Sequence, residues 1–207
     1  MAWNPDYCTA TELKSFLRIT DAADDTELGF AITAASRAID LACNRQFGST
    51  TAAARYYESD GLYLADRPAL AIDDIQSTTS LAVLIDDNAD ATFETTLTND
   101  TDFDLFPWNA TANGEPWTHM VLRPTASASF PEAARSVKIT GVWGWTSVPT
   151  AVKQAALLQA SRFFARRNAP FGVAGSPELG SELRLLAKVD PDVSVALAPY
   201  KRLWAAV

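Results

Sequence analysis

The sequence predicts an α+β protein: an α-helical bundle core formed by the N- and C-terminal helices, with an inserted antiparallel β-rich domain. Apolar residues recur at helical spacing in residues 10–43 and again after Pro149. Between these segments, short apolar runs are separated by turn pairs such as Asp60-Gly61 and Asn113-Gly114, as in antiparallel sheets. The helices at the two ends of the chain must therefore pack together around the middle.

The first segment predicts two helices. Thr9 followed by Glu12 matches a capping box, in which the hydroxyl and the carboxylate each accept a backbone N–H. The second helix is expected to start at Asp24 or Asp25, where a carboxylate caps the helix and opposes its dipole. Apolar residues at positions i, i+4, i+7, i+11 and i+14 predict its core stripe: Leu28, Ile32, Ala35, Ile39 and Ala42.

The middle of the chain predicts six short strands in a small sheet, sandwich or barrel. The strand candidates are residues 56–57, 62–64, 82–85, 103–106, 120–122 and 137–143. Within the last of them, Trp143 and nearby Trp145 form an aromatic cluster. A sugar- or base-stacking platform is one interpretation, but their position between a strand and a helix favours packing.

After Pro149, the pattern predicts a long helix that ends near Arg166-Arg167, where cations suit a helix C-terminus. Asp190 and Asp192 are expected to cap a short helix that Pro199 interrupts. The predicted organisation is an N-terminal part of the core (1–52), the β-rich insertion (53–147), a core helix and loop (148–189) and a C-terminal helix or tail (190–207).

Composition narrows the classes of function. The chain has 207 residues, 48% of them hydrophobic, which suits one domain of ordinary size or a core domain with a sizeable insertion. Net charge is −12 through Val148 and +4 from Pro149 onward. The acidic part argues against tight binding to nucleic acid, because phosphate neutralisation requires clustered Lys and Arg. The sequence shows no signal peptide and no apolar run long enough for a membrane span, so a cytoplasmic protein is expected.

The chain carries no catalytic signature, and we expect no catalytic, metal-binding or cofactor-binding residue and no enzyme activity. Cys8 and Cys43 have no metal or redox spacing and are expected to be buried free thiols. His119 is the one histidine and has no nucleophile motif near it.

Residues 86–97 open like a calcium loop. Asp86, Asn88 and Asp90 have the ligand spacing, but the sixth position is Ala91 where glycine is needed, and the twelfth is Leu97 where glutamate is needed. An acidic hairpin loop is the favoured interpretation.

Two regions are candidates for partner binding. Trp108 and Trp117 lie in segments rich in Pro, Asn and Gly, where an aromatic side chain can serve as an interface anchor. The C-terminal segment combines basic and apolar residues, and is either a final core element or a docking tail: Tyr200, Lys201, Arg202, Leu203 and Trp204.

Several segments together resemble the head–tail connector (adaptor, or head-completion) proteins of tailed bacteriophages. The resemblance rests on residues 7–17, 34–40, 45–47, 140–156, 167–172 and 190–200. It covers both helical ends well and the middle poorly, and none of its motifs is catalytic.

The resemblance implies a structural virion protein at the head–tail interface, assembled in the host cytoplasm. Such proteins form a homo-oligomeric ring, commonly of twelve copies, under the portal. The ring extends the channel through which DNA passes without sequence-specific binding, and it provides the attachment platform for a tail-side connector or tail terminator protein. The resemblance also implies a C-terminal segment that docks on the portal protein, and no membrane.

Two other hypotheses remain open on the sequence. The β-rich middle could be a binding module that recognises carbohydrate or protein through Trp108 and Trp117. A hydrolase centred on His119 is the third.

Overall fold

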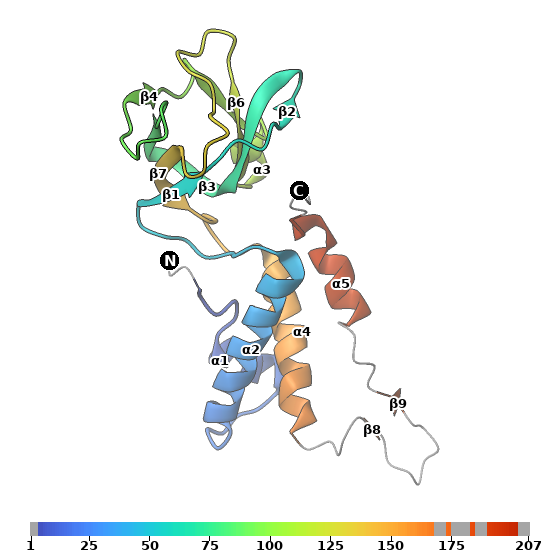
Figure 1. Cartoon of the computed structure of the whole chain (residues 1–207). Helices are drawn as coiled ribbons and strands as arrows, with labels where there is room; N and C mark the ends of the chain where they lie inside the picture. The colour runs from blue at the N-terminus through green and yellow to red at the C-terminus, as the bar shows by residue number, and fades with distance from the viewer. Residues whose placement is uncertain (1–3, 168–172, 175–182, 185–189, 203–207) are drawn as a thin grey trace. The chain divides into compact units, whose positions relative to one another are not determined.

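The computed structural model describes residues 4–167, 173–174, 183–184 and 190–202. These residues form an α+β protein, as predicted, with one unit made of helices and one built on an antiparallel sheet (Figure 1). The helical unit comprises Pro5–Gln46 and described residues from Val148 onward, and the β-rich unit comprises Phe47–Ser147.

The helical unit contains four α-helices: α1 (Ala10–Leu17), α2 (Asp25–Cys43), α4 (Thr150–Arg166) and α5 (Pro191–Leu197). Helix α4 contacts each of the other three, so segments from both ends of the chain pack together (Figure 1). Its buried face consists mostly of small residues, which allows close approach to α2: Val152, Ala155, Ala156 and Ala160. A 3-10 turn, η2 (Ala198–Tyr200), follows α5 at Pro199.

The start of α1 confirms the predicted capping box. The Thr9 hydroxyl accepts from the Glu12 N–H at 3.2 Å, and Glu12 accepts from the Thr9 N–H at 2.9 Å. Glu12 also forms an ion pair with Lys153 of α4, and this interaction is the main cause of the lowered pKa of the Glu12 carboxyl. The cap therefore connects α1 to the helix from the other end of the chain.

Helix α2 begins where expected, but the predicted side-chain cap is wrong. The Asp24 carboxylate makes no hydrogen bond to the first turn of α2. It instead accepts two hydrogen bonds from the Arg167 guanidinium, at 2.5 and 2.7 Å. A bidentate guanidinium contact outcompetes a single N–H, so this carboxylate joins α2 to the end of α4.

The predicted core stripe of α2 is confirmed except at its end. Leu28, Ile32, Ala35 and Ile39 are buried, whereas Ala42 is half-buried and Cys43 is fully buried.

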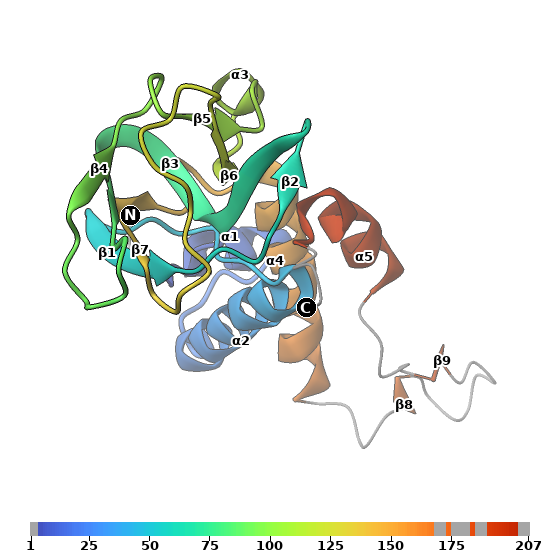
Figure 2. The same ribbon diagram turned by 45° about the horizontal axis from the view of Figure 1, so that its top comes forward.

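The β-rich unit is a bent seven-stranded antiparallel sheet in the order β1-β7-β3-β6-β5, with β2 and β4 paired to β3 (Figure 2). Its elements are β1 (Ala53–Tyr57), β2 (Tyr63–Leu64), β3 (Arg67–Ile85), β4 (Thr95–Leu97), β5 (Phe103–Phe106), the short helix α3 (Ala110–Asn113), β6 (Trp117–Leu122) and β7 (Val137–Trp143). Two further strands of two residues, β8 (Val173–Ala174) and β9 (Leu183–Arg184), pair with each other outside this sheet.

Strand β3 organises this sheet. Its first half pairs with β6 and its second half pairs with β7, and the register shifts between Ala71 and Ile75 and again between Ser77 and Ala82. Register shifts bend a strand, so one long strand can serve both halves of the sheet. The prediction of a separate strand at 82–85 was too short, and β4 was missed.

Strand β7 packs one of its two faces against the hydrophobic core of the sheet. Alternate side chains are buried along it, among them Val137, Ile139 and Trp143, as expected for one face against a core. Trp143 is fully buried, and its indole N–H donates to the Ala53 carbonyl at 2.7 Å. Trp145 is also buried and donates to Asp74 at 3.1 Å, so packing is the correct interpretation of this aromatic pair.

Candidate partner-binding surfaces

Trp108 is the exposed centre of an aromatic surface on the β-rich unit. Half of its side chain is accessible, in the turn between β5 and α3. Phe106 packs edge-on against it with 5.3 Å between ring centroids, and the Arg67 guanidinium lies 5.4 Å from the Trp108 ring centroid. An exposed indole flanked by a cation is suited to a protein or sugar contact. We call Trp108, Phe106 and Arg67 the Trp108 surface.

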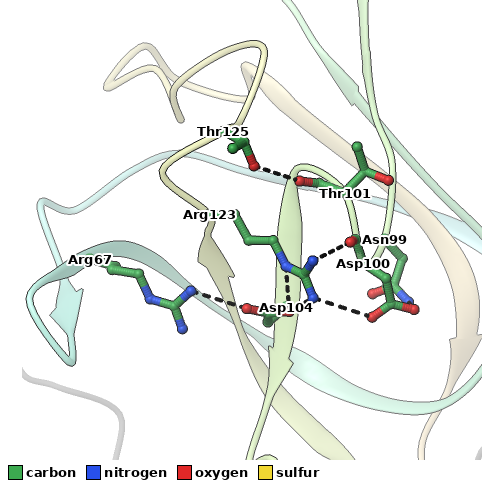
Figure 3. A network of polar contacts seen from close by, with 7 residues as sticks. All are labelled: Arg67, Asn99, Asp100, Thr101, Asp104, Arg123 and Thr125. Carbon is green, nitrogen blue, oxygen red and sulfur yellow. Dashed lines mark hydrogen bonds and ion pairs between the residues drawn. The ribbon is translucent and has the colours of Figure 1, made fainter.

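A network of charged side chains positions Arg67 (Figure 3). Asp104 of β5 accepts from Arg67 at 3.1 Å and from the Arg123 Nε at 2.8 Å. The same Arg123 also donates to the Asp100 carbonyl. The two guanidinium groups, chiefly that of Arg123, lower the pKa of the Asp104 carboxyl. Asp104 therefore stays ionised at neutral pH and keeps Arg67 beside Trp108.

The second predicted tryptophan is placed differently. Trp117 begins β6 and packs against the hydrophobic core of the sheet, so it is only partly exposed. His119 lies two residues further on; its Nδ1 is 2.9 Å from the Thr118 hydroxyl, and its ring packs edge-on against Phe106. His119 therefore contacts the Trp108 surface through Phe106.

The C-terminal segment begins attached to the end of α2. The Arg202 N–H donates to the Cys43 carbonyl at 2.8 Å, and the Asn44 side-chain amide donates to the Arg202 carbonyl at 3.4 Å. Tyr200 ends the 3-10 turn and Lys201 is exposed. The last two predicted docking residues, Leu203 and Trp204, lie outside the described residues.

The acidic loop brings together three carboxylates: Asp86, Asp90 and Glu94. Their oxygens lie within 4.8 Å of one another, and Glu94 occupies the ninth position of the calcium-loop spacing. The loop's own amides bond each of these side chains. Asp86 accepts from the Asp90 and Ala91 N–H groups, Asp90 from that of Thr92, and Glu94 from that of Asp87. The carboxylates thus shape the hairpin loop that the sequence predicts.

The two cysteines are buried free thiols, as predicted. Burial raises the pKa of both the Cys8 and the Cys43 thiol to about 11. Both side chains therefore stay protonated at neutral pH, and a protonated thiol is a poor nucleophile. Within the described part of the chain, no helix is both long and apolar enough to cross a membrane.

Comparisons with known proteins give similarity in structure only. No protein-family model and no curated protein matches the sequence. A chain in the structure "Neck of empty GTA particle computed with C6 symmetry" is 17% identical, with a TM-score of 0.55. A chain in "Neck of native GTA particle computed with C12 symmetry" is 18% identical, with a TM-score of 0.50. Each comparison covers 100% of this chain and 96% of the other, so the likeness in fold is not confined to one of the two units.

Proposed function

We propose that this chain is a structural virion protein, a head–tail connector subunit that forms a ring under the portal. The ring extends the DNA channel and gives the tail its attachment platform. The observation that carries this proposal is the full-length likeness in fold to chains in the necks of GTA (gene transfer agent) particles, which are phage-like. The symmetries named for those necks, C6 and C12, fit a closed ring of identical subunits.

In this proposal the helical bundle is the core of the subunit and residues 53–147 are an insertion. Helix α4 packs on α1 and α2, so both ends of the chain contribute to one assembly unit. The excess of acidic residues through Val148 suits a body past which DNA moves, because DNA binds tightly only to clustered cations.

A genetic experiment tests the proposal. Particles produced without this chain are expected to contain filled heads and free tails that do not join, and supplying the chain in trans should restore joined particles. Normal numbers of joined particles in its absence would rule out the connector role.

Portal docking is assigned to residues 200–204. Truncation after Arg202 removes Leu203 and Trp204 and keeps the residues that form the Arg202–Cys43 backbone hydrogen bond. We expect the truncated protein to keep its thermal midpoint and to lose portal binding in a pull-down. Lys201→Ala is the matched control and should weaken binding only slightly, because one exposed charge contributes little. Wild-type binding by the truncated protein would contradict the assignment.

The Trp108 surface and the partly exposed Trp117 are proposed to contact the tail-side protein or a neighbouring subunit, and a substitution tests the tail-side contact. Trp108→Ala should weaken that binding by about 2 kcal/mol, the usual scale for an interface tryptophan, as measured by calorimetry. Tyr63→Ala is the control, since Tyr63 is another exposed aromatic side chain of the same unit. Equal effects of the two substitutions would contradict the assignment.

The exposure of Trp108 also supports the second candidate, a module that binds carbohydrate. Loss of glycan binding in the Trp108→Ala variant, with tail joining unaffected, would favour that function over the connector.

A further inference from the structure

Helix α2 carries a second apolar stripe, on the side opposite its buried one. Phe30, Ala34, Ala38 and Leu41 follow one another at i, i+4, i+8 and i+11, which places them on one face of the helix. Phe30 is 72% exposed and Leu41 is 80% exposed. The two large side chains are about 16 Å apart along the axis, with alanines between them. We call these four residues the outer stripe.

The same unit has an open groove of about 490 Å³ between α1 and α4. It is lined by Thr11, Glu12, Ser15, Phe16 and Leu157. Phe16 is 44% exposed, so the groove presents an aromatic ring to solvent. The outer stripe projects from α2, and the groove is a shallow depression. The stripe faces away from the helices of its own subunit, because the buried residues of α2 lie on the opposite side.

Charged side chains flank both surfaces, and the carboxylate that lines the groove, Glu12, is neutralised by its ion pair with Lys153. Glu27 lies three residues before Phe30 on the same face of α2 and is exposed. Arg18 lies two residues after Phe16, is exposed, and forms no ion pair among the described residues. Glu27 beside the stripe and Arg18, two residues along the chain from the groove residue Phe16, are therefore opposite in sign. Two unlike surfaces on one subunit make head-to-tail contacts, which close into a ring when the rotation permits.

We propose that the outer stripe of one subunit packs into the α1–α4 groove of the next copy of this chain. This inference rests on the proposed connector ring and names its subunit interface. The contact is heterologous: each copy contributes the stripe to one neighbour and the groove to the other.

Cross-linking of the full-length chain tests the pairing. Ala34→Cys places a thiol in the outer stripe, and Ser15→Cys places one in the groove; both positions are exposed. With a short bismaleimide, the double variant should give a ladder of covalent oligomers, whereas each single variant should give none. The matched control pairs Ser15→Cys with Val195→Cys, since Val195 is an exposed apolar residue of α5 outside the stripe. The control should give no ladder.

Introducing a negative charge into the outer stripe is the second test of the interface. Phe30→Asp or Leu41→Asp in the double-cysteine protein should abolish the ladder and leave the thermal midpoint unchanged, because both side chains are exposed. Dimers from Ala34→Cys alone would show a symmetric stripe-to-stripe contact and overturn the proposal.

Electron microscopy of the same samples distinguishes failure of this interface from failure of the connector function. Rings without a ladder, or rings that survive Phe30→Asp and Leu41→Asp, would overturn this interface and leave the connector function standing. The absence of rings at every concentration, with the portal protein present, would overturn the connector function itself.

Discussion

Replacing Gly144 with alanine is expected to destabilise the β-rich unit strongly. Gly144 follows β7 with φ at +105°, a conformation that side chains disfavour. A Cβ there would lie 2.0 Å from the Gly48 carbonyl oxygen, which is backbone and has no flexible end to move. The Gly144 N–H donates to the Asp74 carbonyl, and the Trp145 N–H donates to the Gly48 carbonyl. These hydrogen bonds fix both segments, so we expect a loss of about 4 kcal/mol in the free energy of unfolding.

Gly61→Ala is the matched control. Gly61 also has a positive φ, at +72°, but nothing lies within 4 Å of its Cβ position. Only the conformational cost applies there, about 1 kcal/mol. Urea unfolding followed by tryptophan fluorescence measures both. Similar costs at the two positions would mean that Gly48 and Gly144 do not approach closely.

The Asp102 carboxylate is expected to be the most important polar group of the β-rich unit. It is buried, and it accepts the Thr98 N–H at 2.7 Å and the Ser127 N–H at 2.9 Å. Asp102→Ala leaves both donors without their partner and should cost about 3 kcal/mol of unfolding free energy. Asp102→Asn retains one acceptor oxygen and should cost less. If Asp102→Ala costs no more than a surface substitution, these hydrogen bonds do not form.

Lowering the pH should reduce the free energy of unfolding of the wild-type protein, because the Asp102 carboxylate becomes protonated. Hydrogen bonds from the backbone of Thr98 and Ser127 lower the pKa of Asp102 in the folded state. Its contribution is therefore complete above its unfolded pKa, about 4, and is lost as pH falls through the lower folded value. Asp104 acts in the same direction, since Arg123 lowers its pKa.

A comparison of unfolding at pH 7 and pH 3 checks this dependence. The urea midpoint of the wild type should fall on acidification, and that of Asp102→Asn should fall less. Asp40 of α2 has the opposite sign, because burial raises the pKa of its carboxyl and protonation favours the folded form. Equal acid sensitivity in the two proteins would contradict the role of Asp102.

Local patterns predicted the elements whose structure depends on near neighbours. The capping box at Thr9 and Glu12 involves residues three apart, and β5 and β7 have the predicted bounds because their alternation is clear in the sequence. Strand β3 was underestimated because its polar run, Ser77–Ser80, interrupts the alternation. Only the change of partner from β6 to β7 explains why the strand continues there.

The candidate surfaces could not be predicted from the spacing of residues in the sequence, because they depend on contacts between residues far apart in the chain. Asp24 has the sequence position of a helix cap, but its carboxylate binds Arg167, which lies far along the chain. The tryptophans at 108 and 117 have similar local sequences, yet one is exposed and the other packs on the core. Phe30 and Leu41 follow a helical period as regular as that of the core stripe, and only the exposure of their side chains reveals a second apolar face.

The most direct test of the connector function is electron microscopy of the purified chain mixed with its portal protein. We predict a closed ring of this chain, coaxial with the portal and sharing its rotational axis, with the helical units in contact around the ring. Monomers that leave the portal unoccupied, at every concentration of the chain, would contradict the proposed function.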